Sequence, residues 1–152
     1  MLCAPRAARI VRVIRKSNSY IAYADGSCIG NPGPGGWGVV LIAPDGTERE
    51  LNGHAAATTN NRMEIAAAVE ALRDIPAGAE VTIRSDSQYV VRTINDGWKR
   101  KMNADCWADL DSEIARHRVT FEWVRGHNGD VMNDRADRLA VMGAKRKLVG
   151  DG

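Results

Sequence analysis

A stretch rich in glycine and proline, residues 25–36, places the strongest constraint on how this chain folds. It reads DGSCIGNPGPGG and separates two short apolar runs at residues 20–24 and 37–42. Glycine permits positive φ and the close approach of another backbone, while proline fixes φ and removes a hydrogen-bond donor. We therefore expect two strands joined by a connection that is shaped for more than chain reversal. Asp25 is expected to end the first strand, beside backbone that a bulky ligand can approach.

The same stretch also fits a plain hairpin in which Asp25 only caps the turn. A phosphate-binding loop does not fit, because no Gly-Lys-Ser/Thr sequence follows and the next element is expected to be a strand rather than a helix. The stretch alone therefore does not identify a function.

Length and composition indicate a single domain with its own core. The chain has 152 residues, 44% of them hydrophobic, and no apolar run approaches the roughly 20 residues needed to span a bilayer. The three cysteines, Cys3, Cys28 and Cys106, are odd in number and lack CxxC spacing, which argues against a disulfide framework or a zinc site. We expect a monomer, with no membrane association, in the reducing environment of the cytoplasm.

Positive charge is concentrated in the first 18 residues, which contain Arg6, Arg9, Arg12, Arg15 and Lys16 and no acidic residue. Subtracting these five charges from the net charge of +2 leaves −3 for the rest of the chain. The spacing of the arginines fits a basic amphipathic helix, suited to a polyanion or to organelle import. A leader without fixed structure, or residues upstream of the native start, fits as well, and we expect residues 1–17 to be a disordered basic arm.

Hydrophobic periodicity and turn residues predict the order of the elements. Strands are expected at residues 20–24, 37–42, 49–55, 80–86 and 119–124, and helices at 58–75, 87–94, 104–117 and 133–145. The helix at 104–117 places Trp107, Leu110 and Ile114 on one face. The order βββαβααβα predicts an α/β fold with a five-stranded mixed sheet flanked by helices, since an antiparallel meander precedes crossover-linked parallel strands.

Four acidic residues lie where strands end or helices begin: Asp25, Glu64, Asp86 and Asp137. Each has a structural explanation as well. Glu64 follows Asn61 at nearly the spacing of a capping box, Asp86 could cap a helix, and Asp137 could face a helix dipole. If the four meet on one rim of the sheet, however, they repel one another unless cations bind. Oxygen ligands in this number suit Mg²⁺ or Mn²⁺, and a pair of such ions catalyses displacement at phosphorus.

Five segments resemble, in order, the motifs of the type 1 ribonuclease H family. They are DGSCIGNPGPGG beginning at Asp25, TTNNRME ending at Glu64, SDSQYV containing Asp86 and Gln88, WVRGH ending at His127, and NDRADRLA containing Asp137. The match extends from about residue 19 to 145, and five ordered motifs are highly specific. The resemblance implies a ribonuclease H-like catalytic domain over residues 18–147, followed by a tail at 148–152.

The resemblance also implies an activity and a set of site residues. The expected enzyme is an endonuclease that hydrolyses the RNA strand of an RNA·DNA hybrid with two Mg²⁺ ions, or Mn²⁺ as a substitute, and leaves 5′-phosphate and 3′-hydroxyl ends. Asp25 would bridge both ions, and Asp137 would complete the site of the ion that activates water. Glu64 and Asp86 would hold the ion at the leaving 3′-oxygen. His127 would assist proton transfer or product departure.

A nuclease for hybrids must distinguish RNA from DNA, and the 2′-hydroxyl group does so at every nucleotide. Glycine permits close approach, so this group is expected to meet the turn at residues 26–31 together with the side chains of Asn60 and Gln88. Thr59, with Asn31 or Asn61, would contact the DNA strand. The full set of expected substrate-binding residues is Gly26, Cys28, Gly30, Asn31, Thr59, Asn60, Asn61 and Gln88. Helix capping alone stays an alternative for Asn60 and Asn61.

One segment departs from the family pattern. Many bacterial members carry a basic helix and loop, the handle, after the helix that contains Gln88, whereas here only WKRKMNAD at residues 98–105 connects to the next helix. Phosphate neutralisation supplies most sequence-independent affinity, so other basic groups must replace the handle: residues 99–101, residues 145–147 or the arm. Trp98 and Trp107 could stack on bases, but we expect both to belong to the core.

Two other functions stay open on sequence alone. A DNA-cutting nuclease of the same superfamily would share the fold and the carboxylates, and the residues expected to meet the 2′-hydroxyl argue against it. A hybrid-binding module without activity is the second. Nothing in the sequence favours it, because the four carboxylates and His127 are all present.

Overall fold

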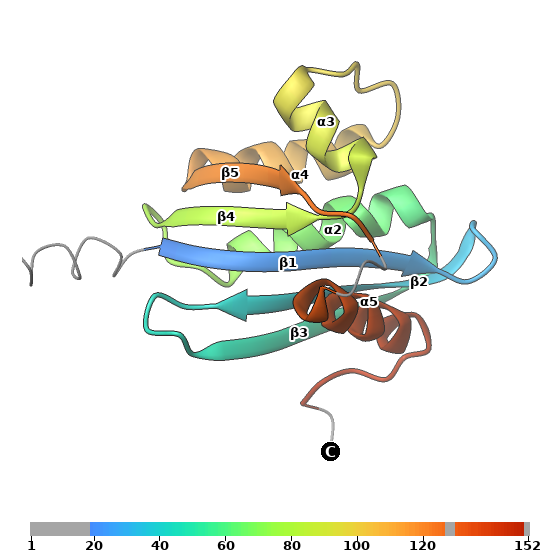
Figure 1. Cartoon of the computed structure of the whole chain (residues 1–152). Helices are drawn as coiled ribbons and strands as arrows, with labels where there is room; N and C mark the ends of the chain where they lie inside the picture. Colours follow the sequence, from blue (N-terminus) through green and yellow to red (C-terminus); the bar gives the residue numbers. More distant parts are fainter. Residues whose placement is uncertain (1–18, 127–129, 151–152) are drawn as a thin grey trace, which may run out of the picture.

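The structure is a computed structural model that describes residues 19–126 and 130–150, and its elements follow the expected order βββαβααβα (Figure 1). The strands are β1 (Ser19–Cys28), β2 (Gly33–Ile42), β3 (Glu48–Thr58), β4 (Glu80–Ser85) and β5 (Arg118–Trp123). The helices are α2 (Asn60–Arg73), α3 (Gln88–Asp96), α4 (Ala104–Ala115) and α5 (Val131–Ala144). Within the described ranges, no helix has the length and apolar character needed to cross a membrane. The basic arm and His127 lie outside the described residues.

The strands form one mixed sheet in the order β3-β2-β1-β4-β5. β2 pairs antiparallel with both β1 and β3, whereas β4 pairs parallel with both β1 and β5. The pairing of β1 with β4 ends at Ala24 opposite Ser85. Asp25 and Asp86 are the residues that follow this last pair in the sequence, and the parallel pairing therefore brings them side by side at the same end of the two strands.

Helices cover both faces of this sheet, with α5 on one face and α2 and α4 on the other (Figure 1). Successive side chains of a strand point to opposite faces, and β1 divides its residues accordingly. Ala22 and Ala24 belong to the apolar cluster that contains α2 and α4, whereas Tyr23 packs with Ala136 and Leu139 of α5. β1 is therefore buried from both sides, and Asp25 points to the side of α5.

The expectation that Asp25 ends its strand is wrong, because β1 continues to Cys28 and remains paired with β2 up to Gly35. The glycines of β2 serve helix packing along this extension. A Cβ atom added to Gly38 would lie 2.4 Å from the carbonyl oxygen of Ala136, and one added to Gly36 would lie 2.2 Å from the amide nitrogen of Ala144. The glycine-rich stretch therefore lets the backbone of α5 lie directly on the sheet.

The two tryptophans expected in the core differ. Trp107 is 2% exposed and packs with Leu110, as the periodicity predicted. Trp98 is 47% exposed, so this expectation is wrong. Gly97 ends α3 in the left-handed conformation, which stops the helix before Trp98, and the Trp98 ring lies beneath the guanidinium of Arg92 at 5.9 Å.

Candidate active site

Three carboxylates from three different elements converge beyond the β1–β4 pairing. Asp25 comes from β1, Glu64 from α2 and Asp86 from the residue after β4, and each offers an oxygen atom within 4.8 Å of the other two. Asp25 and Glu64 are buried, at 4% and 8% exposure, whereas Asp86 is partly exposed. This separation allows the three side chains to share a divalent cation.

Gly26 brings Glu64 to this place. A Cβ atom on Gly26 would lie 2.5 Å from the amide nitrogen of Glu64, so only glycine allows α2 to lie so close to β1. The Gly26 amide donates hydrogen bonds to Glu64 Oε1 at 2.6 Å and to Asp25 Oδ1 at 2.9 Å. One backbone N–H thereby orients two of the three carboxylates.

Asp137 of α5 belongs to the same electrostatic unit. Burial and the negative charges of Glu64 and Asp86 raise the pKa of Asp25 to about 11, and a hydrogen bond with Asp137 adds to this effect. Burial also raises the pKa of Glu64, to about 7, and the charges of Asp86 and Asp137 contribute. Four carboxyl groups in this arrangement cannot all ionise cheaply without a cation, so the donor set fits Mg²⁺ or Mn²⁺.

The helix-end explanations for these acidic residues are wrong, because other residues do that work. Thr59 caps α2, and its hydroxyl accepts from Arg62 N at 3.3 Å. Ser87 caps α3, and Asp130 caps α5 with hydrogen bonds from two backbone amides. Glu64 and Asp137 both lie beyond the first turn of their helices. The carboxylates of the cluster are left for another role.

The expected substrate-binding residues belong to the end of β1, the β1–β2 turn and the starts of α2 and α3. Asn31 Oδ1 accepts a hydrogen bond from Asn60 N at 2.9 Å, which ties the turn to the helix. The Cys28 thiol donates to the carbonyl oxygens of Thr58 and Gly33 at 3.4 and 3.5 Å. Gln88 is the exposed first residue of α3, and Asn61 is exposed at the start of α2.

The connection after α3, residues 97–103, is held in a defined place beside α2. The Tyr89 hydroxyl accepts hydrogen bonds from Asn103 Nδ2 at 3.1 Å and Trp107 Nε1 at 3.2 Å. Arg62 donates to Asp105 Oδ2 at 2.6 Å and to Asn103 Oδ1 at 3.3 Å. A groove between this connection and the start of α2 is lined by Thr59, Asn61, Tyr89, Lys99, Lys101, Met102 and Asn103.

The sequence predicted α4 from the apolar spacing around Trp107. It did not predict that Arg62 and Tyr89 hold the walls of this groove in place. Arg62 and Tyr89 lie inside two of the motifs, but their partners are 41 and 14 residues away along the chain. No local sequence pattern predicts a contact between residues so far apart along the chain.

The family model described as RNase H matches residues 17–145. The chain belongs to the ribonuclease H family. The chain is 48% identical over 140 residues to the Ribonuclease H of Pseudomonas entomophila, an alignment that covers 84% of this chain and 94% of that protein. A Pseudomonas putida protein named Ribonuclease HI is 47% identical over the same shares of both chains. The chain is accordingly a nuclease and a hydrolase.

Two solved structures support the same assignment. The N-terminal RNase H domain of a Mycobacterium tuberculosis protein is 28% identical, with a TM-score of 0.76 over 86% of this chain and 96% of that one. LC11-RNase H1, solved in complex with an RNA/DNA hybrid, is 28% identical, with a TM-score of 0.73 over 84% of this chain and 97% of that one. The ribonuclease H-like fold and the type 1 assignment are therefore confirmed.

Proposed function

We propose that this member of the ribonuclease H family is an endonuclease that hydrolyses the RNA strand of an RNA·DNA hybrid and leaves 5′-phosphate and 3′-hydroxyl ends. The observation that carries the proposal is the convergence of Asp25 of β1, Glu64 of α2 and Asp86 directly after β4, within 4.8 Å. The hybrid bound to the related LC11-RNase H1 supports the choice of substrate.

Two Mg²⁺ ions, when bound, would supply the charge that activates water and stabilises the leaving 3′-oxygen. The residues that would hold them are Asp25, Glu64, Asp86 and Asp137. Asp25 interacts with all three of the others, and this central place supports its role as the ligand shared by both ions. Glu64 and Asp86 would serve one side and Asp137 the other, with Mn²⁺ as an alternative metal. His127, outside the described residues, would take part in proton transfer or product departure.

The RNA strand would lie against the β1–β2 turn. Gly30 and Asn31 lie in this turn, Gly26 and Cys28 lie in the part of β1 that leads to it, and the bond between Asn31 and Asn60 N joins the turn to α2. This backbone, with Asn60 and Gln88, would read the 2′-hydroxyl groups that distinguish RNA from DNA.

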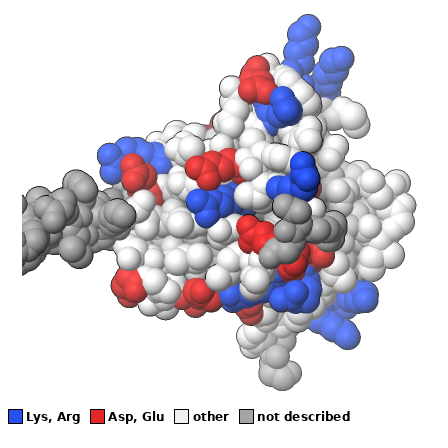
Figure 2. All heavy atoms as spheres, in the orientation of Figure 1, with Lys and Arg blue, Asp and Glu red and all other residues white. Residues whose placement is uncertain are grey.

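The DNA strand would occupy the groove that begins at Thr59 and Asn61. Figure 2 shows Lys and Arg side chains gathered over the connection after α3, at the top of the view, and again beside α5, with acidic side chains near the centre. Lys99 and Lys101 line the groove, and neither forms an ion pair with another described residue, whereas Arg100 binds Asp111 at 2.5 Å. These lysines, with residues 145–147 and the arm, would replace the handle that the connection lacks.

The test is the cleavage of one end-labelled sequence prepared as RNA·DNA hybrid, RNA duplex, DNA duplex and single strands, each with Mg²⁺, Mn²⁺ or EDTA. We expect metal-dependent cutting of only the RNA strand of the hybrid, with 5′-phosphate ends, by a monomeric protein. The Asp25→Asn variant is the matched control and should be inactive in every lane. Cutting of the DNA duplex would favour a DNA nuclease, and binding of the hybrid without cutting would favour a binding module.

A further inference from the structure

The end of β5 runs alongside Asp86. The pairing of β4 with β5 ends at Ser85 opposite Trp123, and one more ladder bond follows, from Val124 N to Ser85 O at 2.9 Å. The indole Nε1 of Trp123 then donates to the backbone carbonyl of Asp86 at 3.2 Å. A side chain therefore continues the contact between β4 and β5 one residue past the regular ladder, at the backbone carbonyl of the residue whose carboxylate belongs to the cluster.

Gly126 lies against the side-chain carboxylate of Asp86. A Cβ atom on Gly126 would lie 2.6 Å from Asp86 Oδ2 and 3.3 Å from Asp86 Cγ. The backbone of Gly126 thus packs directly against the carboxylate, and any side chain at this position would displace it. Segment 123–126 touches Asp86 at its carbonyl oxygen and at its carboxylate oxygen.

The orientation of Asp86 depends on contacts with segment 123–126, whereas Asp25 and Glu64 are held in other ways. Asp25 and Glu64 are buried and share the Gly26 amide, whereas Asp86 is partly exposed and lies in the bend between β4 and α3. Trp123 itself is 44% exposed, in contrast to Trp107 at 2%. Burial of the indole therefore contributes less to its position than in the core, and the hydrogen bond to Asp86 is the specific contact.

We propose that Trp123 and Gly126 are positioning residues that hold Asp86 in the orientation needed to bind the divalent cation. The proposal rests on the proposed function, in which Asp86 is a metal ligand. Groups that orient metal ligands typically change metal affinity by 10–100-fold when they are replaced. Trp123 fixes the backbone of Asp86 and Gly126 limits the space of its carboxylate, so two different substitutions disturb one ligand by independent routes.

The test is a titration of the free protein with Mn²⁺, with the unbound ion measured by electron paramagnetic resonance. Trp123→Phe retains the aromatic ring and removes the N–H donor, and Gly126→Ala adds the obstructing Cβ atom. We expect each variant to bind Mn²⁺ about tenfold more weakly than wild type. In hybrid cleavage at fixed metal, kcat should fall while KM for the hybrid is unchanged, and higher metal concentration should restore kcat.

Trp107→Phe is the matched control, because Trp107 Nε1 also donates one hydrogen bond at 3.2 Å, to Tyr89, away from the carboxylates. It should lower the melting temperature without changing Mn²⁺ affinity. If Trp123→Phe behaves in the same way, with wild-type Mn²⁺ affinity and only a lower melting temperature, the positioning role is wrong. A wild-type protein that neither binds Mn²⁺ nor cuts the hybrid would instead refute the proposed function itself.

Discussion

Asp25 is a buried carboxyl group that the fold keeps next to three others, and this has a predictable effect on stability. Its pKa is raised in the folded protein, mainly by burial and then by the charges of Glu64 and Asp86. The unfolded chain releases this proton near its ordinary value of 3.8, while the folded state retains it. The free energy of unfolding therefore decreases, for this group, as the pH rises from about 4 through neutrality.

Replacing Asp25 with Asn should remove this penalty along with the activity. In EDTA at pH 7.5 we expect the variant to be more stable than wild type by up to about 5 kcal/mol, since each unit by which the pH exceeds the ordinary pKa of 3.8 lowers the stability of the wild-type protein by about 1.4 kcal/mol. The gain should shrink toward pH 4. Urea denaturation of both proteins at several pH values measures it, and a variant less stable than wild type across the whole range would contradict the account.

Metal binding gives the same residue a second measurable effect. A ligand that binds only the folded state raises stability in proportion to the logarithm of its concentration over its dissociation constant. Adding Mg²⁺ should therefore raise the melting temperature of the wild-type protein and change that of Asp25→Asn little. Equal shifts in both proteins would mean that the ion binds elsewhere.

At the scale of elements, the contact between α5 and β2 decides whether Asp137 reaches the cluster. A Cβ atom on Gly38 would meet both Ala136 O at 2.4 Å and Ala140 N at 2.6 Å. Gly38→Ala should push α5 away from the sheet, with a loss of about 2–3 kcal/mol as for other overpacked sites, and should reduce kcat because Asp137 moves with its helix. Chemical denaturation and steady-state cleavage measure the two effects.

Gly46 provides the control for this substitution. It lies in the β2–β3 turn with φ of +88°, and an added Cβ atom there would meet nothing within 4 Å. Gly46→Ala should therefore cost about 1 kcal/mol for backbone strain and leave kcat unchanged. If both variants lose the same stability and neither loses activity, the close packing of α5 does not position Asp137.

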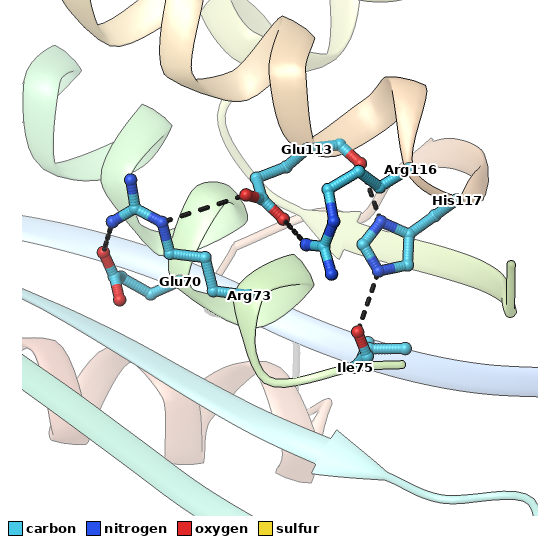
Figure 3. A network of polar contacts seen from close by, with 6 residues as sticks. All are labelled: Glu70, Arg73, Ile75, Glu113, Arg116 and His117. Carbon is cyan, nitrogen blue, oxygen red and sulfur yellow. Dashed lines mark hydrogen bonds and ion pairs between the residues drawn. The ribbon is translucent and has the colours of Figure 1, made fainter. Parts of the chain in front are cut away.

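His117 joins α4 to the connection between α2 and β4, as Figure 3 shows. Its Nδ1 lies 2.7 Å from Glu113 O and its Nε2 lies 2.9 Å from Ile75 O, and the side chain is buried. His117→Phe retains a ring but removes the contact to Ile75 O, whereas Glu113 O keeps the hydrogen bond from Arg116 N at 3.1 Å. A loss of about 1–3 kcal/mol is therefore expected. Thermal and urea denaturation measure it.

The surrounding ion pairs offer a contrast within the same picture. Arg116 and Arg73 both approach Glu113, at 2.5 and 4.0 Å, but their side chains are 46% and 50% exposed. Exposed pairs typically contribute less than about 1 kcal/mol, so Arg116→Ala should change stability far less than His117→Phe. A larger loss in the arginine variant would mean that the ion pairs, and not the histidine, join these elements.

For the molecule as a whole, the sequence predicted the element order and the type of sheet, because periodicity and turn residues are local. It also pointed to the four acidic residues, because short ordered motifs mark them. It did not predict which residues cap the helices: Thr59, Ser87 and Asp130 take those places, and neighbouring polar residues were equally plausible.

Contacts between distant parts of the chain explain the other differences. Trp123 and Asp86 are 37 residues apart, and the partner of Gly38 is a helix near the other end of the chain. Local patterns carry no signal for either contact. The sequence indicated that the glycine-rich stretch has a role beyond chain reversal. It did not indicate that Gly36 and Gly38 allow the backbone of α5 to pack on β2.

The charge distribution leads to the last prediction, which concerns how the hybrid is attracted. Residues 19–152 carry a net charge of −3, so a polyanionic substrate must be bound by local groups of positive charge. Each phosphate contact adds about 0.9 to the slope of log affinity against log salt concentration. Lys99→Ala/Lys101→Ala should raise KM for the hybrid and reduce this slope by about 1–2.

The control removes two positive charges from the opposite end of the sheet. Arg49 and Arg116 form ion pairs with Asp74 and Glu113. Arg49 pairs with Leu41 near the end of β2, and Arg116 accepts a hydrogen bond from Gly78 N, just before β4. Arg49→Ala/Arg116→Ala changes the net charge equally and should leave the slope nearly unchanged.

Deleting residues 1–17 tests the basic arm. If KM and the slope stay unchanged in the deletion variant, the arm does not replace the handle. Lys99 and Lys101, with residues 145–147, then remain as its replacement. Equal slopes for both double variants would instead mean that only the total charge matters, and that the groove at Thr59 does not hold the DNA strand.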